Sequence, residues 1–297
     1  MVNEHPVLEN QVLLGDCSQL LSTLPKTFFQ AIITSPPYFG HRQYSDDAPL
    51  NEIGRETHLD DYLQRLLRVF ALAQTVLRDD GLLWLNLGDT YRDKHLLGVP
   101  WRVALALQDQ GWILRSDIIW HKPNAMPSSV RTRPTTDHEY IFMFSKSENY
   151  YYDADAIREP HVTFTGQSRM KGGRKHLGVR NSTPEAGKNG SNSNLHNGRW
   201  DQAFHPKGRN KRTVWSIPLG KFRGAHFAVY PEKLVEPCLL ASTKQGDYVL
   251  DPFAGSGTTG VVALKHQRYF TGIELVKKYQ VMAQLRLDEL VAQPNLF

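Results

Sequence analysis

Ser35, two prolines and Tyr38 form a rigid motif, Ser-Pro-Pro-Tyr, at the end of an apolar run that covers 31–33. Consecutive prolines fix the backbone, so the carbonyl of Ser35 or Pro36 becomes an acceptor that is held in one direction. The Ser35 hydroxyl can also accept a hydrogen bond, and the Tyr38 ring offers a face on which a planar group can stack. Two fixed acceptors beside a stacking face suit the positioning of an amine on a flat ring.

Such a motif is suited to a difficult reaction, the alkylation of the exocyclic amine of a nucleobase. That nitrogen is a poor nucleophile because its lone pair is delocalised into the ring. Acceptors for both of its N–H groups favour a pyramidal nitrogen whose lone pair points at a methyl donor, and such positioning can carry the catalysis. No strong base is required, since the positively charged product nitrogen loses its proton readily. A base inside a duplex must be flipped out to reach such a site.

A second motif, Gly255-Ser-Gly257-Thr-Thr-Gly260, matches G-x-G-x-x-G between a predicted strand and a predicted helix. Glycine allows a tight turn and a close approach of ligand to backbone, and the N–H groups that open the helix favour a carboxylate or phosphate. Glu274, at the end of the next predicted strand, can accept hydrogen bonds from ribose hydroxyls. The motif fits a dinucleotide or S-adenosylmethionine, and the alternative is a plain tight turn.

Asp251, just before the glycine turn, distinguishes these two ligands. A carboxylate repels a pyrophosphate but attracts the amino group of a methionine moiety. The chain also ends 23 residues after Glu274, so the second half-site for a dinucleotide would have to come from the N-terminal zone. Both observations favour S-adenosylmethionine.

Apolar periodicity predicts the elements that must position these motifs. Strands are expected at 11–16, 30–35, 82–89, 112–123, 138–147 and 268–275, and helices at 59–81, 99–111, 230–247 and 277–292; residues 248–267 read as strand, glycine turn and helix. Alternating strands and helices predict an α/β fold with a parallel sheet covered by helices on both faces.

The order of the motifs predicts a circularly permuted, Rossmann-like sheet. A nucleoside site needs a third strand end beside the second, and only 12–16 can supply it, with Asp16 placed to reach an adenine amino group. Residues 249–275 then form the first two strands and 11–35 the next two, which is permissible where the termini lie close together. Because carboxyl ends of strands face the ligand in such sheets, the Ser-Pro-Pro-Tyr tip should lie beside the reactive end of the cofactor.

Charge is spread unevenly along the 297 residues, whose net charge is +5. Residues 158–212 hold twelve Lys or Arg and three Asp or Glu, a net charge of +9, which leaves −4 for the rest. We therefore divide the chain into a catalytic half (1–150), a basic target-recognition region (151–213) and a cofactor-binding half (214–297). The middle region is rich in Gly, Asn and Ser, and is either a flexible loop or a binder of a polyanion.

Composition excludes several other classes of protein. No run of eighteen apolar residues exists, so no membrane span is expected, and the first residues lack the features of a signal peptide. Cys17 and Cys238 are far apart and the histidines show no metal spacing, which predicts a cytoplasmic protein without a disulfide framework or metal.

The segments "TSPPY" (34–38) and "DPFAGSGTT" (251–259) resemble those of the amino-methylating DNA methyltransferases. Their order, with a recognition region between them, is similar to that of the permuted β group of bacteria, their phages and restriction–modification systems. The segments "LLWLNLGD", "WHKPNAMPSS" and "HEYIFMFSKS" share the resemblance. It implies S-adenosylmethionine as cofactor, double-stranded DNA as substrate and a cognate restriction endonuclease as a possible partner. "HFAVYP" (226–231) resembles the segment that lines the methionine end of the cofactor site.

Serine at the first position of the tip motif resembles members that methylate cytosine N4, whereas adenine-N6 members usually carry Asp or Asn there. Methylation of cytosine carbon 5 needs a cysteine nucleophile; Cys17 follows Asp16, and Cys238 follows Pro237 but falls within the helix predicted over 230–247, so this reaction is not expected. We expect a site-specific cytosine-N4 DNA methyltransferase. The alternatives are an adenine-N6 enzyme, an RNA or protein-amide methyltransferase, and a non-catalytic DNA-binding module.

These inferences assign three sets of residues. The base-amine site comprises Ser35, Pro36, Pro37 and Tyr38. The cofactor site comprises Asp16, Thr34, His226, Phe227, Asp251, Pro252, Phe253, Ala254, Gly255, Ser256, Gly257, Thr258, Glu274 and Leu275. DNA contacts are expected from Arg131, Arg133, Arg169, Lys171, Arg174, Lys175, Arg209, Lys211 and Arg212.

Overall fold

The computed structural model describes residues 8–40, 52–160, 207–220 and 230–292. The chain separates into two compact units, of which the first combines Met1–Asp153 with Arg212–Phe297 and the second comprises Ala154–Lys211. In the described part, no helix is both long and apolar enough to cross a membrane, and no cluster of three or more His, Cys, Asp or Glu could hold a metal ion.

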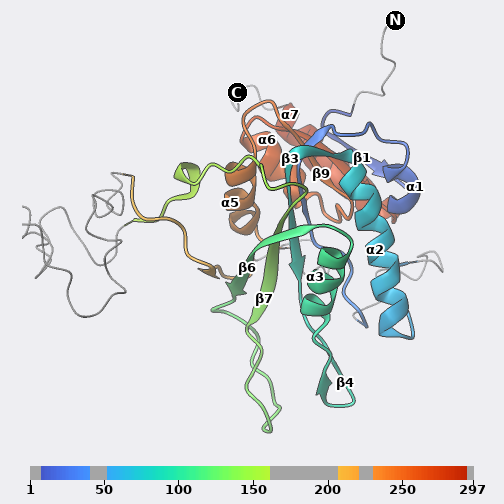
Figure 1. The fold of residues 1–297 in the computed structure, drawn as a ribbon, viewed down its shortest axis with the longest axis vertical. Coiled ribbons are helices and arrows are strands. Elements are labelled where there is room, and N and C mark those ends of the chain that lie inside the picture. The colour runs from blue at the N-terminus through green and yellow to red at the C-terminus, as the bar shows by residue number, and fades with distance from the viewer. Residues whose placement is uncertain (1–7, 41–51, 161–206, 221–229, 293–297) are drawn as a thin grey trace, which may run out of the picture. The chain divides into compact units, whose positions relative to one another are not determined.

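The first unit is built on an eight-stranded sheet in the order β1-β10-β9-β2-β3-β7-β6-β8 (Figure 1). Its strands are β1 (Gln11–Leu14), β2 (Phe29–Thr34), β3 (Leu77–Leu87), β6 (Ile113–His121), β7 (His138–Ser145), β8 (Val214–Ser216), β9 (Tyr248–Asp251) and β10 (Tyr269–Glu274). A separate two-stranded ribbon pairs β4 (Tyr91–Arg92) with β5 (His95–Leu96). The helices are α1 (Cys17–Leu21), α2 (Leu59–Val76), α3 (Val99–Asp109), α5 (Glu232–Ser242), α6 (Thr258–Lys265) and α7 (Lys277–Val291).

Strand pairing confirms the permuted α/β fold. β1 pairs in parallel with β10, and β10 with β9, so 12–16 supplies the strand end beside Glu274 as predicted. Strand β2 is not placed beside β1. It pairs in parallel with β9, on the side of β9 opposite β10. The Ser-Pro-Pro-Tyr tip and the glycine turn therefore follow adjacent strands. β3 is parallel to β2, whereas β7 is antiparallel to β3.

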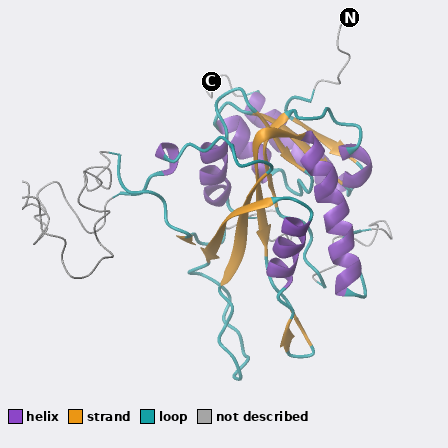
Figure 2. Cartoon of the chain, in the orientation of Figure 1, coloured by secondary structure: helices purple, strands orange, loops and turns teal. Residues whose placement is uncertain are grey.

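Helices cover both faces of this sheet (Figure 2). Helix α2 packs against both α1 and α3, and helix α6 packs against both α5 and α7. Every residue of β2 is buried, which explains its unbroken apolar run, since a strand of a parallel sheet is covered on both faces. Phe29, Phe70 and Phe142 are among the large side chains that are fully buried in the core.

The start of β3 corrects one predicted boundary. The helix expected over 59–81 ends at Val76, because Leu77 adopts extended backbone (φ −74°, ψ 139°) and pairs with Phe29 of β2. Gly81 is required here, since a Cβ at this position would lie 2.7 Å from the Leu77 side chain and 2.9 Å from the Gln30 carbonyl oxygen. Pairing with β2 thus overrides the helical periodicity.

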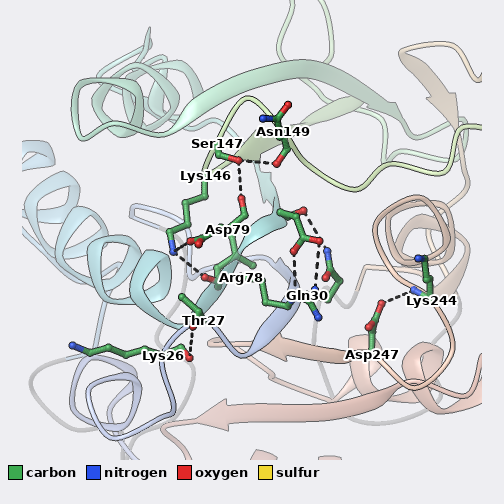
Figure 3. Close-up of polar contacts among 12 residues, drawn as sticks. Lys26, Thr27, Gln30, Arg78, Asp79, Lys146, Ser147, Asn149, Lys244 and Asp247 are labelled. Atoms are coloured by element: carbon green, nitrogen blue, oxygen red, sulfur yellow. Dashed lines mark hydrogen bonds and ion pairs between the residues drawn. The ribbon is translucent and has the colours of Figure 1, made fainter.

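Side chains from neighbouring segments hold the same stretch (Figure 3). Lys146 Nζ forms an ion pair with Asp79 at 2.8 Å and donates to the Leu77 carbonyl at 3.2 Å. Ser147 Oγ donates to the Asp79 carbonyl at 2.8 Å. These contacts bind the start of β3 to residues that follow β7.

The second unit is described only at its two ends. It contains a short 3₁₀ helix (Asp155–Ile157) and an antiparallel bridge between Glu159 and Arg209. Arg158 donates to Asp155 at 2.6 Å and to the Gly208 carbonyl at 3.0 Å. Most of the basic region lies outside the described residues, so its predicted flexibility and its boundaries at 151 and 213 stay predictions.

Candidate active site

The Ser-Pro-Pro-Tyr tip and the glycine turn meet at one edge of the sheet. They follow the parallel neighbours β2 and β9, so their carboxyl ends lie side by side. A buried hydrogen bond from Thr34 Oγ1 to Asp251 Oδ1, 2.6 Å long, joins the last residues of the two strands. Residues separated by 217 positions in the sequence are thus held in direct contact.

Asp251 is completely buried and its carboxylate is well satisfied. Besides Thr34, it accepts hydrogen bonds from Thr259 Oγ1 (2.8 Å), the Tyr230 hydroxyl (3.0 Å) and the Phe253 N–H (3.0 Å). Burial raises the pKa of this carboxyl and the hydrogen bonds oppose the rise. Asp251 therefore ties β9 to β2, α6 and the segment before α5, and its contact with a methionine amino group stays a prediction.

The glycine turn after β9 is held from two sides. Gly255 N–H donates to Glu274 Oε2 at 2.9 Å, and Ala254 N–H donates to the Ile273 carbonyl at 2.9 Å, so β10 supports the turn. From α7, Arg286 Nη1 donates to the Ser256 carbonyl at 2.5 Å. The turn is therefore a preformed element.

Gly257 caps the amino end of α6 in the left-handed region, with φ of 77°. A Cβ there would lie 3.0 Å from the Ala283 Cβ of α7. The first N–H groups of a helix have no partner inside it, so Thr258 and its neighbours offer donors to an anionic group. Ser256 and Thr258 add hydroxyls 3.2 Å apart at the same helix end.

Glu274 ends β10 with a carboxylate that has capacity for further donors. Oε1 accepts from Val276 N–H at 2.8 Å, and Oε2 accepts from Gly255 N–H. A carboxylate has about four acceptor sites, so room remains for the hydroxyls of a ribose. Burial raises its pKa to about 7, because backbone N–H groups offset only part of the desolvation.

Asp16 follows β1, and its role as an adenine contact stays a prediction. Its Oδ1 caps α1, accepting from Ser18 N–H at 2.9 Å and Gln19 N–H at 3.2 Å. Oδ2 takes no part in this cap. Because β1 neighbours β10, Asp16 and Glu274 follow adjacent strands, as a nucleoside site requires.

The tip motif is fixed by hydrogen bonds that its sequence does not reveal. Tyr62 of α2 donates to the Pro37 carbonyl at 2.9 Å. The Tyr38 hydroxyl donates to Glu139 Oε2 at 2.7 Å and accepts from Asn86 Nδ2 at 2.6 Å. Gly88 leaves space for the ring, since a Cβ there would lie 2.6 Å from Tyr38 Cε2.

Asn86 and Glu139 are candidate site residues that sequence reasoning missed, and Lys122 belongs to the same cluster. They come from β3, from the start of β7 and from the residue after β6, which meet at the same edge because β7 is antiparallel to both strands. Lys122 is paired with Glu139 and lies over the Trp120 ring at 4.4 Å. The sequence signal for them was a polar residue at or next to the end of each strand, beside the apolar residues of that strand.

The predicted DNA contacts are only partly described. The loop 122–137 and the β4–β5 ribbon extend beyond the same end of the sheet (Figure 1), and the Arg133 guanidinium lies 3.6 Å from the Tyr91 ring centroid. Arg131 and Arg212 are exposed. In the second unit, Arg209 and Lys211 both pair with Glu159, at 3.2 and 3.5 Å.

Several predicted site residues lie outside the described residues: His226, Phe227, Arg169, Lys171, Arg174 and Lys175. Among the other cofactor candidates, Pro252 and Ala254 are buried, whereas Phe253 and Leu275 are half-buried at the ends of β9 and β10. The roles assigned to these residues stay predictions.

The donor set fits S-adenosylmethionine. Carboxylates at the ends of β10 and β1 suit the hydroxyls and amine of a nucleoside, and the amino end of α6 suits a carboxylate. A sheet with this site beside a rigid pair of acceptors defines a methyltransferase of the permuted, Rossmann-like class.

Comparison with known proteins gives the family. The model of the DNA methylase family, whose members methylate N6 or N4 amines, matches residues 29–285. The type II methyltransferase M.Cfr9I of Citrobacter freundii is 41% identical over 303 residues, which cover 92% of this chain and 86% of that protein. M.SmaI of Serratia marcescens is 37% identical, with coverage of 93% and 90%. The chain belongs to the DNA methylase family and is an amino DNA methyltransferase.

Solved structures show the same fold. The cytosine-N4-specific PvuII DNA methyltransferase superposes with a TM-score of 0.66 at 19% identity, covering 95% of this chain and 92% of that one. The complex of M1.HpyAVI with S-adenosylmethionine gives a TM-score of 0.58 at 21% identity, with coverage of 94% and 98%.

Proposed function

We propose that this chain transfers a methyl group from S-adenosylmethionine to the N4 amine of cytosine in duplex DNA, after the base has been flipped out. The observation that carries the proposal is the Thr34–Asp251 hydrogen bond, which holds the tip motif against the glycine turn. A methyl donor bound at the turn would therefore face an amine bound at the tip.

At the tip, the Ser35 hydroxyl and the Pro36 carbonyl accept hydrogen bonds from the target amine. The Tyr38 ring stacks on the base, and the Tyr62 hydroxyl keeps the Pro37 carbonyl fixed. When bound, S-adenosylmethionine supplies a methyl group on a positively charged sulfur. Rigid acceptors of this kind contribute by positioning and by stabilising the charge that develops on nitrogen.

At the glycine turn, the N–H groups of α6 hold the carboxylate of the cofactor and Glu274 accepts from its ribose. Asp16 Oδ2 is placed to accept from the adenine amine. Desolvation of Glu274 is offset when hydroxyl donors bind it, so these contacts favour the ionised carboxylate.

The choice of cytosine N4 over adenine N6 is supported by Ser35 at the first position of the tip. The basic region 151–213 would contact DNA and read the recognised sequence, and the type II names of the relatives support a cognate endonuclease that cuts the same sequence.

The test is transfer of labelled methyl groups by the purified chain to duplex DNA, followed by chromatography of the nucleosides. We expect N4-methylcytosine, and expect Ser35→Ala to slow transfer while cofactor affinity stays near that of the wild type. N6-methyladenine as the product would overturn the cytosine assignment, and label in RNA alone would overturn DNA as the substrate.

A further inference from the structure

Tyr38 lies at the centre of a polar cluster that reaches beyond the tip motif. Asn86 Nδ2, which has two protons to donate, lies within hydrogen-bond distance of the Tyr38 hydroxyl (2.6 Å), Glu139 Oε2 (2.9 Å) and Ser35 Oγ (3.3 Å). Ser35 Oγ donates to the Tyr38 hydroxyl at 3.4 Å, and that hydroxyl donates to Glu139 Oε2 at 2.7 Å. A chain of two hydroxyl groups thus runs from the predicted base-amine site to a carboxylate.

The direction of this chain follows from the kinds of group at its ends. An ionised carboxylate only accepts hydrogen bonds, and a hydroxyl has a single proton to donate. The Tyr38 hydroxyl therefore donates its hydrogen bond to Glu139, and the Tyr38 oxygen is left to accept from Ser35 and Asn86. With its own proton directed at Tyr38, Ser35 has lone pairs left for another donor.

The orientation of the Asn86 amide is also set by Glu139. The reverse orientation would place Oδ1 against the carboxylate, which is repulsive. Asn86 is 6% exposed, and its Oδ1 is buried without a hydrogen-bond partner in the described structure. Asn86 Oδ1 is thus left unpaired, which is unfavourable. The shortest hydrogen bonds of the cluster are all made to Tyr38 or Glu139.

Lys122 occupies the second oxygen of the Glu139 carboxylate. Its ammonium group forms an ion pair with Oε1, while Oε2 receives Tyr38 and Asn86. The two side chains are 14% and 16% exposed, so the pair is only weakly screened by water. The two oxygens of the carboxylate therefore have separate partners.

We propose that Glu139 is a positioning residue for methyl transfer. Because Glu139 accepts the hydrogen bond from the Tyr38 hydroxyl, the Ser35 hydroxyl points its hydrogen at Tyr38 and away from the substrate. Ser35 Oγ then presents lone pairs to the N–H of the target amine. This inference rests on the proposed function, because Ser35 must face an amine. In this role Glu139 acts through Tyr38 and Ser35.

Glu139→Gln provides a sharp test, since the amide has one acceptor and one donor end. Opposite Lys122, the amide turns its oxygen to the ammonium and its NH₂ to Tyr38. The hydroxyl chain then reverses and Ser35 points its proton at the substrate amine. We expect the single-turnover rate to fall about 10- to 100-fold, the range for one lost charged hydrogen bond, while Kd values for cofactor and DNA change less than about twofold.

Lys122→Met provides the rescue. Without the ammonium, the amide introduced by Glu139→Gln is free to turn its oxygen back to Tyr38. We therefore expect the double variant to recover most of the rate of Lys122→Met alone, which serves as its reference. A loss of equal size with and without Lys122 would overturn the proposal, because a structural defect would not be rescued by a second substitution.

Tyr38→Phe supplies a second, independent measurement. With the hydroxyl chain cut, E139Q should cost less than about twofold. Thermal unfolding reports whether each variant is folded. The matched control is Asp79→Asn, at an exposed carboxylate that pairs with Lys146 at the opposite end of β3, and we expect its rate to be unchanged. If the wild type transfers methyl groups and E139Q does so at the same rate, the positioning role of Glu139 is refuted and the proposed function is not. Absence of transfer in the wild type would instead overturn the proposed function.

Discussion

At the scale of single residues, the Glu274 carboxylate should make cofactor affinity depend on pH. Its pKa in the free protein is raised to about 7 by burial, and ribose hydroxyls bind the ionised form. Affinity should be constant well above pH 7 and fall as the pH drops, by about tenfold at pH 6. Calorimetric titration with S-adenosylmethionine across this range measures the effect.

The stability of the free protein should show the opposite trend. Because the folded-state pKa of Glu274 lies above its ordinary value of 4.5, the folded state binds more protons between pH 4.5 and 7. The contribution of this group to stability is therefore present below pH 4.5 and is lost as the pH rises through 7.

The Glu274→Gln variant tests whether this carboxyl causes the pH dependence of cofactor affinity. It should remove the loss of affinity at acid pH. An acid loss of the same size in that variant would assign it to another group.

Gly88 is a residue whose lack of a side chain places the Tyr38 ring. A Cβ would lie 2.6 Å from Tyr38 Cε2 and 3.4 Å from Glu139 Cγ, so Gly88→Ala must displace the ring. We expect a loss of about 1–3 kcal/mol in the free energy of unfolding, as for other overpacked sites, and slower methyl transfer. Both would be measured beside Tyr38→Ala.

In the Tyr38→Ala background the clash no longer exists. Gly88→Ala should then leave the unfolding free energy unchanged to within about 0.5 kcal/mol. A similar loss in both backgrounds would show that Gly88 acts through its own backbone and not through the ring.

At the scale of elements, the packing of α7 on the glycine turn decides whether the cofactor site can form. Gly257 has φ of 77°, and a Cβ would meet Ala283 at 3.0 Å. Gly257→Val combines a strained backbone with a clash, and we expect the cofactor affinity to fall at least about 100-fold in calorimetry.

A milder pair of variants separates the two causes. Gly257→Ala keeps the strain and the contact, whereas adding Ala283→Gly removes the contact alone. The double variant should recover part of the affinity. Normal affinity in Gly257→Val would show that the cofactor does not use this turn.

Local motifs were predictable because each is encoded in a few consecutive residues. Ser35-Pro36-Pro37-Tyr38 and the turn at 255–257 needed only the rule that parallel strands end at one edge. The boundary at Leu77 was missed because pairing with Phe29, a long-range contact, overrides a helical pattern. A single sequence does not state such a pairing.

The cluster around Tyr38 was missed for a related reason. Glu139 is 101 residues from Tyr38, and the two meet only through the antiparallel register that pairs Asn86 with Ile141. Strand types and ends can be read from apolar patterns, whereas this register depends on the packing of both sheet faces. Sequence reasoning therefore named the candidate reacting groups and not the residues that would orient them.

At the scale of the whole molecule, the charge distribution governs binding to DNA. Residues 158–212 carry a net charge of +9 and the remainder −4, so phosphate contacts should come mainly from the basic region. Each phosphate that is neutralised adds about −0.9 to the slope of log K against log salt. Replacing Arg169, Lys171, Arg174 and Lys175 by Gln should reduce the slope by about 3 to 4 and weaken binding to all sequences.

Arg209 and Lys211 should contribute less than the other basic residues. Both pair with Glu159, so DNA must compete with an existing carboxylate. Replacing these two by Gln should change the slope by less than the value of about 0.9 per residue that an unpaired basic residue would contribute, and Glu159→Gln should steepen the slope by freeing both. Arg78→Gln, at an exposed ion pair with Asp80, is the matched control. An unaltered slope after the fourfold replacement, measured by fluorescence anisotropy with duplex DNA, would mean that another surface binds the phosphates.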